Sequence, residues 1–172
     1  MTRRTLSPSS PWLLVVLATL VALGPLSVDM YIPAMPAMQD DLDATISQMH
    51  LTLSAYLAGF AVFHLLCGPL ADRYGRKPVL LWGSVVFVFA CVGCSFSDSI
   101  GELLLYRLLQ GIGACVGPTI ARTIVRDVFG PKRAARAFSI MAMMMALAPA
   151  IAPTLGGAML LILPWSSIFV FL

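Results

Sequence analysis

Two ionisable residues, Asp29 and Arg107, lie inside long apolar stretches of the sequence. A charge at the middle of a bilayer costs about 2.5–3.5 kcal/mol even on the lenient insertion scale, and such groups usually face a protein interior or a water-filled cavity. Arginine stays protonated in proteins, so only the aspartate can carry a proton. Burial and a nearby arginine act on a carboxyl group in opposite directions, which predicts a protonation switch at Asp29. A static buried ion pair that fixes helix packing is the alternative.

The two residues are predicted to lie at similar depths. Asp29 is ten residues before Gln39, the first strongly polar residue beyond it, and Arg107 is eight residues after Ser99. At 1.5 Å per helical residue, these separations are roughly 15 Å and roughly 12 Å. We therefore expect the first and fourth apolar stretches to bring the two residues together in a shared cavity. Gln110 is one helical turn after Arg107 and shares its face.

Other polar side chains in the apolar stretches allow more than one interpretation. Tyr31, Tyr56 and Gln110 are candidates for lining a substrate cavity. For the two tyrosines, helix packing or lipid exposure are the alternatives. A proton-transfer role is conceivable for His64, but a neutral histidine that bonds across helices is the favoured interpretation. No metal site is expected, because no second C-x-x-C and no loop histidine accompany the four cysteines, which all lie in apolar runs: Cys67, Cys91, Cys94 and Cys115.

The composition defines the elements that must position these residues. Of the 172 residues, 59% are hydrophobic and only 11% are charged, whereas a soluble domain carries about 25% charged residues. Too few polar residues are present to cover a soluble fold. The sequence therefore predicts an integral membrane protein, and an all-α one, because a lipid-exposed backbone must satisfy its own hydrogen bonds.

Five apolar runs are long enough to cross the hydrocarbon core, which takes about 20 residues. They cover residues 12–33, 49–71, 78–96, 100–121 and 138–163, and residues 165–172 begin a sixth run. The fold class predicted is thus an all-α membrane protein with five complete spans and a truncated sixth. An end inside an apolar run also makes us expect an incomplete chain.

The basic residues predict the orientation. Ten of the 11 Lys and Arg residues fall on one side of the predicted spans, and Arg107 is the exception. The loops on the other side carry Asp40, Asp41, Asp43 and Asp98 instead. Because basic loops stay in the cytoplasm, residues 1–11 are predicted to be a cytoplasmic N-terminus. The charge totals argue against a nucleic-acid partner, and the absence of G-x-S-x-G and H-E-x-x-H motifs argues against an enzyme.

Three motifs resemble those of the major facilitator superfamily. Residues 68–77 resemble its signature between spans two and three, G-x-L-A-D-R-x-G-R-K. The sequence Arg107-x-x-Gln110-Gly111-x-Gly113-Ala114 resembles the fourth-span motif tied to proton transfer. Residues 148–157 are similar to the fifth-span antiporter motif g-x-x-x-G-P-x-x-G-G, with alanine at both of the first two glycine positions. The resemblance implies the N-terminal six-helix half of a major-facilitator fold, with the C-terminal half missing.

Three further segments resemble the bicyclomycin and chloramphenicol resistance (Bcr/CflA) efflux family: residues 26–36, 49–56 and 125–129. The resemblance implies proton-driven export of small amphipathic drugs across the cell inner membrane, with the proton gradient as energy source and no cofactor. His64 stands where that family often has glutamine. Two alternatives remain open: a facilitator-type importer or uniporter of the same superfamily, and a non-transporting membrane subunit.

The resemblance also implies roles for individual residues. Asp29 is the expected proton-binding acid and Arg107 its partner. A cytoplasmic latch is expected from Gly68, Asp72, Arg73, Gly75 and Arg76, with Asp127 as the candidate partner of Arg76. A kinked, tightly packed helix that limits ion leak is expected from Pro153, Gly156 and Gly157.

Overall fold

The computed structural model describes residues 11–129 and 131–172. Every regular element in these two ranges is helical: α1 (Pro11–Asp29), η1 (Ile32–Ala34), α2 (Met35–Asp41), α3 (Ile46–Tyr74), α4 (Arg76–Ser95), α5 (Ile100–Ala114), α6 (Val116–Val128), α7 (Pro131–Leu160) and α8 (Ser166–Phe171). Five stretches of helix among the described residues are long and apolar enough to cross a membrane. The predicted all-helical membrane fold is therefore confirmed. Residues 1–10, with Arg3 and Arg4, lie outside the described residues.

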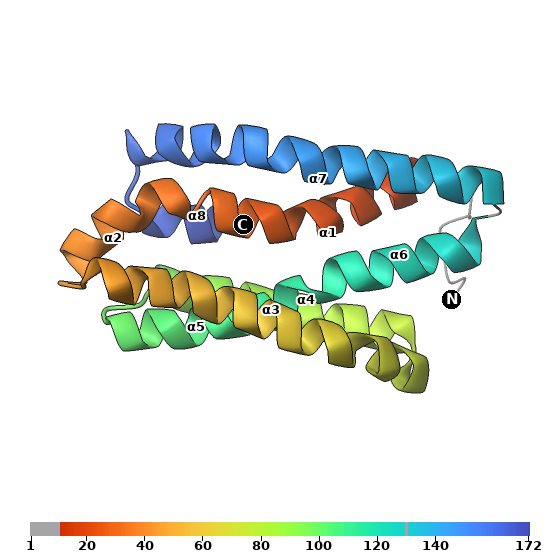
Figure 1. Cartoon of the computed structure of the whole chain (residues 1–172), viewed down its shortest axis with the longest axis horizontal. Helices are drawn as coiled ribbons and strands as arrows, with labels where there is room; N and C mark the ends of the chain where they lie inside the picture. The colour runs from red at the N-terminus through yellow and green to blue at the C-terminus, as the bar shows by residue number, and fades with distance from the viewer. Residues whose placement is uncertain (1–10, 130) are drawn as a thin grey trace, which may run out of the picture.

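The long helices run side by side and form two groups (Figure 1). Helix α5 packs along α3 and α4, while α1 packs along α7. Helix α6 contacts both groups, and the short α8 lies against α4. The residues of the first and fourth predicted spans therefore occupy the middle of the bundle, where they can meet.

The first predicted span is interrupted at Asp29. An α-helix bonds each N–H to the carbonyl four residues earlier, so the carbonyl of Asp29 would need the N–H of residue 33, which is a proline and has none. Helix α1 accordingly ends at Asp29, and the chain passes through the 3₁₀ turn η1, where the N–H of Ala34 donates to the carbonyl of Tyr31 at 3.0 Å. Asp29 thus lies at a helix end inside a membrane-spanning segment.

The fourth predicted span is interrupted in the same way. Pro118 cannot donate to the carbonyl of Ala114, so α5 ends at Ala114 and α6 begins at Val116. Neither interruption is part of the span prediction. Broken helices at membrane depth are tolerated where other protein groups surround the exposed backbone.

Glycines allow α5 and α6 to approach three neighbours closely. A Cβ atom on Gly111 would overlap the carbonyl oxygen of Tyr56 in α3. On Gly113 it would lie 2.6 Å from the backbone nitrogen of Phe87 in α4, and on Gly117 2.6 Å from the carbonyl oxygen of Leu20 in α1. The backbone of α5 and α6 therefore lies directly against the backbones of α3, α4 and α1, a close approach that small residues permit in membranes.

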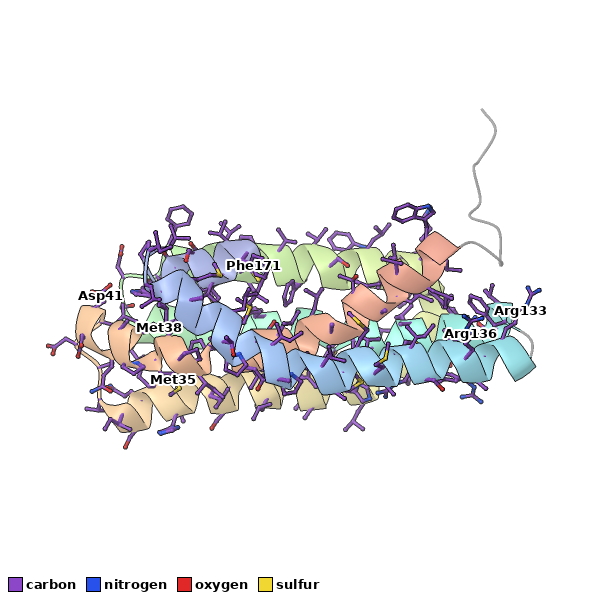
Figure 2. All side chains as sticks on the ribbon, turned by 90° about the horizontal axis from the view of Figure 1, so that it is seen from above. Met35, Met38, Asp41, Arg133, Arg136 and Phe171 are labelled. Atoms are coloured by element: carbon purple, nitrogen blue, oxygen red, sulfur yellow. The ribbon has the colours of Figure 1, made fainter. Side chains whose placement is uncertain are left out.

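The two ends of the bundle differ in charge. Figure 2 shows Asp41, beyond Met35 and Met38, at one end and Arg133 and Arg136 at the other. At the acidic end, Trp165 Nε1 donates to Asp41 Oδ2 at 2.7 Å and ties the segment before α8 to α2. We refer below to the end with Arg133 and Arg136 as the basic end.

Candidate functional site

Arg107 is the centre of the candidate site. Its side chain is fully buried in α5, with an exposed fraction of 0%. Nη1 donates to the carbonyl oxygen of Ser27 in α1 at 3.1 Å and to Oε1 of Gln110 at 2.7 Å. The arginine therefore joins α1 to α5 at the level that the sequence predicts for Asp29 and Arg107.

Two tyrosine rings enclose the guanidinium group of Arg107. Its Cζ lies 4.0 Å from the ring centre of Tyr31 and 4.6 Å from that of Tyr56. The Tyr31 hydroxyl is hydrogen-bonded to Thr52 Oγ1, and the Tyr56 hydroxyl donates to the carbonyl of Gly24 at 3.1 Å. A cation over an aromatic face gains about 2 kcal/mol or more when both are desolvated. The charge is therefore stabilised by ring faces and neutral oxygen atoms.

Two donors of the guanidinium group remain without a partner. Nε and Nη2 of Arg107 are buried and have no hydrogen-bond acceptor among the described residues. A buried donor without an acceptor costs about 1–3 kcal/mol, and more when the group is charged. The site can therefore accept one further acceptor group, and a carboxylate matches the two-donor geometry of arginine best.

Asp29 does not supply that acceptor in this structure. The only ion pair among the described residues joins Arg76 and Asp127, so the expected pair between Asp29 and Arg107 is not formed. Asp29 lies between Ser27 and Tyr31, which both contact Arg107, but its own side chain is partly exposed and forms no ion pair with the arginine.

The other expected cavity residues are buried around Arg107. The exposed fractions of Tyr31, Tyr56 and Gln110 are 0%, 1% and 0%, so these side chains line no open cavity in this conformation. Gln110 Nε2 contacts Cys91 Sγ at 3.1 Å and links α5 to α4. All three side chains hold the arginine or its neighbours here, and a substrate-lining role for them stays a prediction.

His64 bonds across helices, as the favoured interpretation predicted. The Thr119 hydroxyl donates to the carbonyl of Cys115 at 2.7 Å and is therefore the acceptor for His64 Nδ1, at 2.9 Å. The imidazole ring also stacks on Phe60, with ring centres 5.8 Å apart and planes 9° apart. The hydrogen bond connects α3 to α6, and the ring contact lies within α3.

The predicted latch residues lie at the basic end. Arg76, the first residue of α4, forms an ion pair with Asp127 near the end of α6. Gly75 joins α3 to α4 with a positive φ of 89°, a conformation that glycine adopts without strain. The guanidinium group of Arg73 lies 5.3 Å from the ring centre of Tyr74.

Asp72 is exposed and forms no ion pair with any described residue, and a Cβ on Gly68 would meet no atom within 4 Å. In the antiporter motif, a Cβ on Gly156 would lie 2.8 Å from the carbonyl oxygen of Met30, so α7 contacts the chain directly after Asp29. A Cβ on Gly157 would meet nothing within 4 Å, and α7 remains one helix through Pro153. Only Gly156 is needed for close contact.

Sequence reasoning missed two contributors to this site. Ser27 acts through its backbone carbonyl, which no residue type can signal. Thr52 is hydrogen-bonded to Tyr31, which is 21 positions away in sequence. A polar residue in an apolar helix is a weak signal of such a contact.

Comparisons with known proteins show which family this chain belongs to. A model of the Major Facilitator Superfamily matches residues 13–172. The chain therefore belongs to the Major Facilitator Superfamily, and its five apolar helices make it a multi-pass membrane protein.

Among curated relatives, the chain is similar to multidrug resistance protein MdtL of Shigella flexneri serotype 5b (strain 8401), with 40% identity over 150 residues. It is 39% identical over 150 residues to MdtL of Escherichia coli O45:K1 (strain S88 / ExPEC). Each match covers 87% of this chain and 38% of the relative. The chain thus spans well under half the length of the relatives that it matches.

Proposed function

We propose that the chain is the N-terminal helical half of a proton-coupled exporter of small amphipathic drugs, of the Bcr/CflA kind. We place it in the inner membrane with its N-terminus in the cytoplasm, because the basic end carries Arg76, Arg133 and Arg136 and basic residues favour the cytoplasmic side. The similarity to MdtL, a multidrug resistance protein, supports the drug-export part of this proposal.

The observation that carries the proposal is the way in which Arg107 is held. Its charge is stabilised by two ring faces and two neutral oxygen atoms, while Nε and Nη2 have no acceptor. A carboxyl group near this site can therefore gain or lose a proton without leaving the arginine unsupported. Asp29, two residues after Ser27 and at the end of α1, is the carboxyl group that we assign to this role.

Asp29 is located where a small backbone change can move it. Helix α1 ends at Asp29 because Pro33 supplies no N–H, so the segment that follows is less constrained than a continuous helix. In the proposed cycle, ionised Asp29 turns toward the two open donors of Arg107. A proton from outside neutralises the carboxylate and favours the conformation described here, with the pair separated.

Drug and proton need not touch the same atoms. They only need to favour opposite conformations of the same protein, as in alternating access by rocking of two helical halves about a central site. Gly156 of α7 contacts the backbone of Met30 directly after Asp29, so α7 and the end of α1 would move together. The Arg76–Asp127 ion pair would close the cytoplasmic side of this half. A second helical bundle would supply the other side of the drug site.

The proposal is tested by joining this chain to the C-terminal remainder of the Escherichia coli MdtL relative and reconstituting the product in vesicles. We expect a drug added on one side to drive proton movement in the opposite direction. Asp29→Asn should abolish this coupling, whereas the exposed loop variant Asp98→Asn should retain it. Unchanged coupling in Asp29→Asn would exclude Asp29 as the proton carrier. Drug transport without any proton movement in the parent would favour a uniporter.

A further inference from the structure

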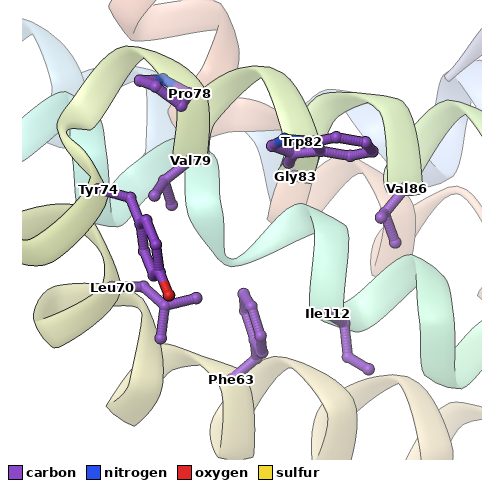
Figure 3. Close-up of a pocket in the computed structure, with 9 residues that line it drawn as sticks. All are labelled: Phe63, Leu70, Tyr74, Pro78, Val79, Trp82, Gly83, Val86 and Ile112. Atoms are coloured by element: carbon purple, nitrogen blue, oxygen red, sulfur yellow. The ribbon is translucent and has the colours of Figure 1, made fainter.

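A mainly apolar pocket opens between α3, α4 and α5 (Figure 3). Its volume is about 330 Å³. Phe63 and Leu70 come from α3, Trp82 and Val86 from α4, and Ile112 from α5. Tyr74 lies at the end of the pocket nearest the α3–α4 connection. Neither the proton site nor the proposed drug site uses these residues.

The mouth of this pocket belongs to an exposed apolar surface on a helix that is long and apolar enough to cross a membrane. Trp82 is 72% exposed although it lines the pocket, and its neighbours on α4, Leu81, Val85 and Phe89, are between 56% and 60% exposed. Helix α4 is one of the membrane-capable helices. Where this face meets the bilayer, acyl chains cover it, and the molecule available to enter the pocket is then a lipid chain.

An apolar pocket alone cannot select a particular lipid. A lipid tail gains no hydrophobic free energy on leaving other lipid tails, because these are as apolar as the side chains that it meets. Any preference must come from polar groups at the end of the pocket where a headgroup would lie. The sequence around Tyr74 and Pro78, which both line the pocket, supplies such groups.

Two exposed cations flank the end of the pocket. Arg73 precedes Tyr74 and lies over its ring, and Lys77 precedes Pro78. Neither forms an ion pair with any described residue, whereas Arg76 between them is already paired with Asp127. The exposed carboxylate of Asp72 offsets part of this charge. Basic residues at a membrane surface attract anionic headgroups, and arginine is well suited to phosphate.

We propose that this pocket is a binding site for an anionic membrane phospholipid. One acyl chain lies between α3, α4 and α5 beside Trp82, and the phosphate lies at Arg73 and Lys77. A bound lipid would contact both α3 and α4 close to Gly75, which connects them. The proposal does not rest on the proposed drug transport.

Trp82 allows a direct test, because bromine atoms on an acyl chain quench tryptophan fluorescence on contact. The chain carrying Trp12→Phe and Trp165→Phe is placed in phosphatidylcholine nanodiscs that contain brominated phosphatidylglycerol or, in parallel, brominated phosphatidylcholine at the same mole fraction. We expect the anionic lipid to reach half-maximal quenching at an about fivefold lower mole fraction, the size expected for one net basic group at a membrane surface.

Two variants separate the parts of the proposal. Arg73→Gln with Lys77→Gln should make the two quenching curves coincide, while Arg126→Gln, an exposed cation on α6, should leave the preference intact. Val86→Phe should remove the preference by filling the pocket, whereas Val88→Phe, exposed on the same helix outside it, should not. Coincident curves in the parent protein would overturn the proposal. A preference that survives Val86→Phe would overturn the assignment of the chain to the pocket.

Discussion

Two arginines of this protein are held in opposite ways. Arg76 lies at the surface of the basic end and pairs with a carboxylate, that of Asp127. Arg107 lies fully buried in the middle of the bundle and has no carboxylate partner among the described residues. An exposed ion pair typically contributes only about 0–1 kcal/mol, whereas removing one partner of a buried charge costs about 3–5 kcal/mol.

The difference teaches which contacts can change during a transport cycle. The Arg76–Asp127 pair can open at little cost, which suits a contact that forms in one conformation only. The neutral groups around Arg107 cannot all be withdrawn, since the guanidinium group would be left buried and unsupported. In the proposed cycle the arginine therefore stays in place, and the carboxyl group of Asp29 moves relative to it.

The largest effect is expected from Arg107→Met. The variant removes the buried charge but leaves the Ser27 carbonyl and Gln110 Oε1 without their donor, so we expect a loss of at most about 1–3 kcal/mol in the free energy of unfolding. Proton-coupled drug exchange should nevertheless be lost completely. A larger loss of stability together with residual transport would favour the alternative, a purely structural role for the arginine.

A smaller effect is expected where α5 packs closely against α3 beside the Tyr56 ring. Gly111 lies against the carbonyl oxygen of Tyr56, so Gly111→Ala should push α5 away from α3 and from the Tyr56 ring. We expect a loss of about 1–3 kcal/mol in the free energy of unfolding. Gly101→Ala, in the same helix but with no atom within 4 Å of the added Cβ, is the control and should not destabilise. Equal behaviour of both variants would contradict this close contact.

The contribution of the Tyr31 ring can be separated from that of its hydroxyl. Tyr31→Phe removes only the hydrogen bond to Thr52 and should lower the free energy of unfolding by about 1 kcal/mol. Tyr31→Leu also removes the ring face over Arg107 and should cost about 2 kcal/mol more. Chemical unfolding of both variants measures the difference. If they are equally stable, the cation–π contact contributes nothing.

The smallest effect is expected at the surface pair. A double-mutant cycle with Arg76→Gln and Asp127→Asn should give a coupling energy of at most about 1 kcal/mol. The coupling should decrease as salt is added, because exposed charges are screened. A coupling of about 2 kcal/mol, the size expected for the Tyr31 ring at Arg107, would remove the contrast between the two arginines.

Much of the fold could be predicted from the sequence, because hydrophobic runs of a given length determine which segments can cross a bilayer. The heights of Asp29 and Arg107 also followed, since the rise per residue of a helix is fixed; Arg107 does reach α1, at Ser27. The height of a residue does not show how the helix is rotated about its axis. It therefore cannot tell which residue of α1 touches Arg107.

Other features required the structure because they depend on several segments at once. The two aromatic rings at Arg107 come from residues 25 positions apart in sequence, and neither residue type distinguishes a cation–π contact from a cavity wall. The helix ends at Asp29 and Ala114 do have a local cause, the missing N–H of Pro33 and Pro118. Prolines are tolerated inside α7, however, so their effect depends on the neighbouring helices.

The most direct test of the proposed role of Asp29 is proton release on drug binding to the detergent-purified protein joined to the MdtL remainder, in weakly buffered solution without any gradient. We predict that adding a drug releases protons in the parent and in Asp98→Asn, because drug and proton favour opposite conformations. Asp29→Asn should bind the drug without releasing protons. Equal proton release from Asp29→Asn and the parent would contradict the assignment of Asp29 as the group that exchanges the proton.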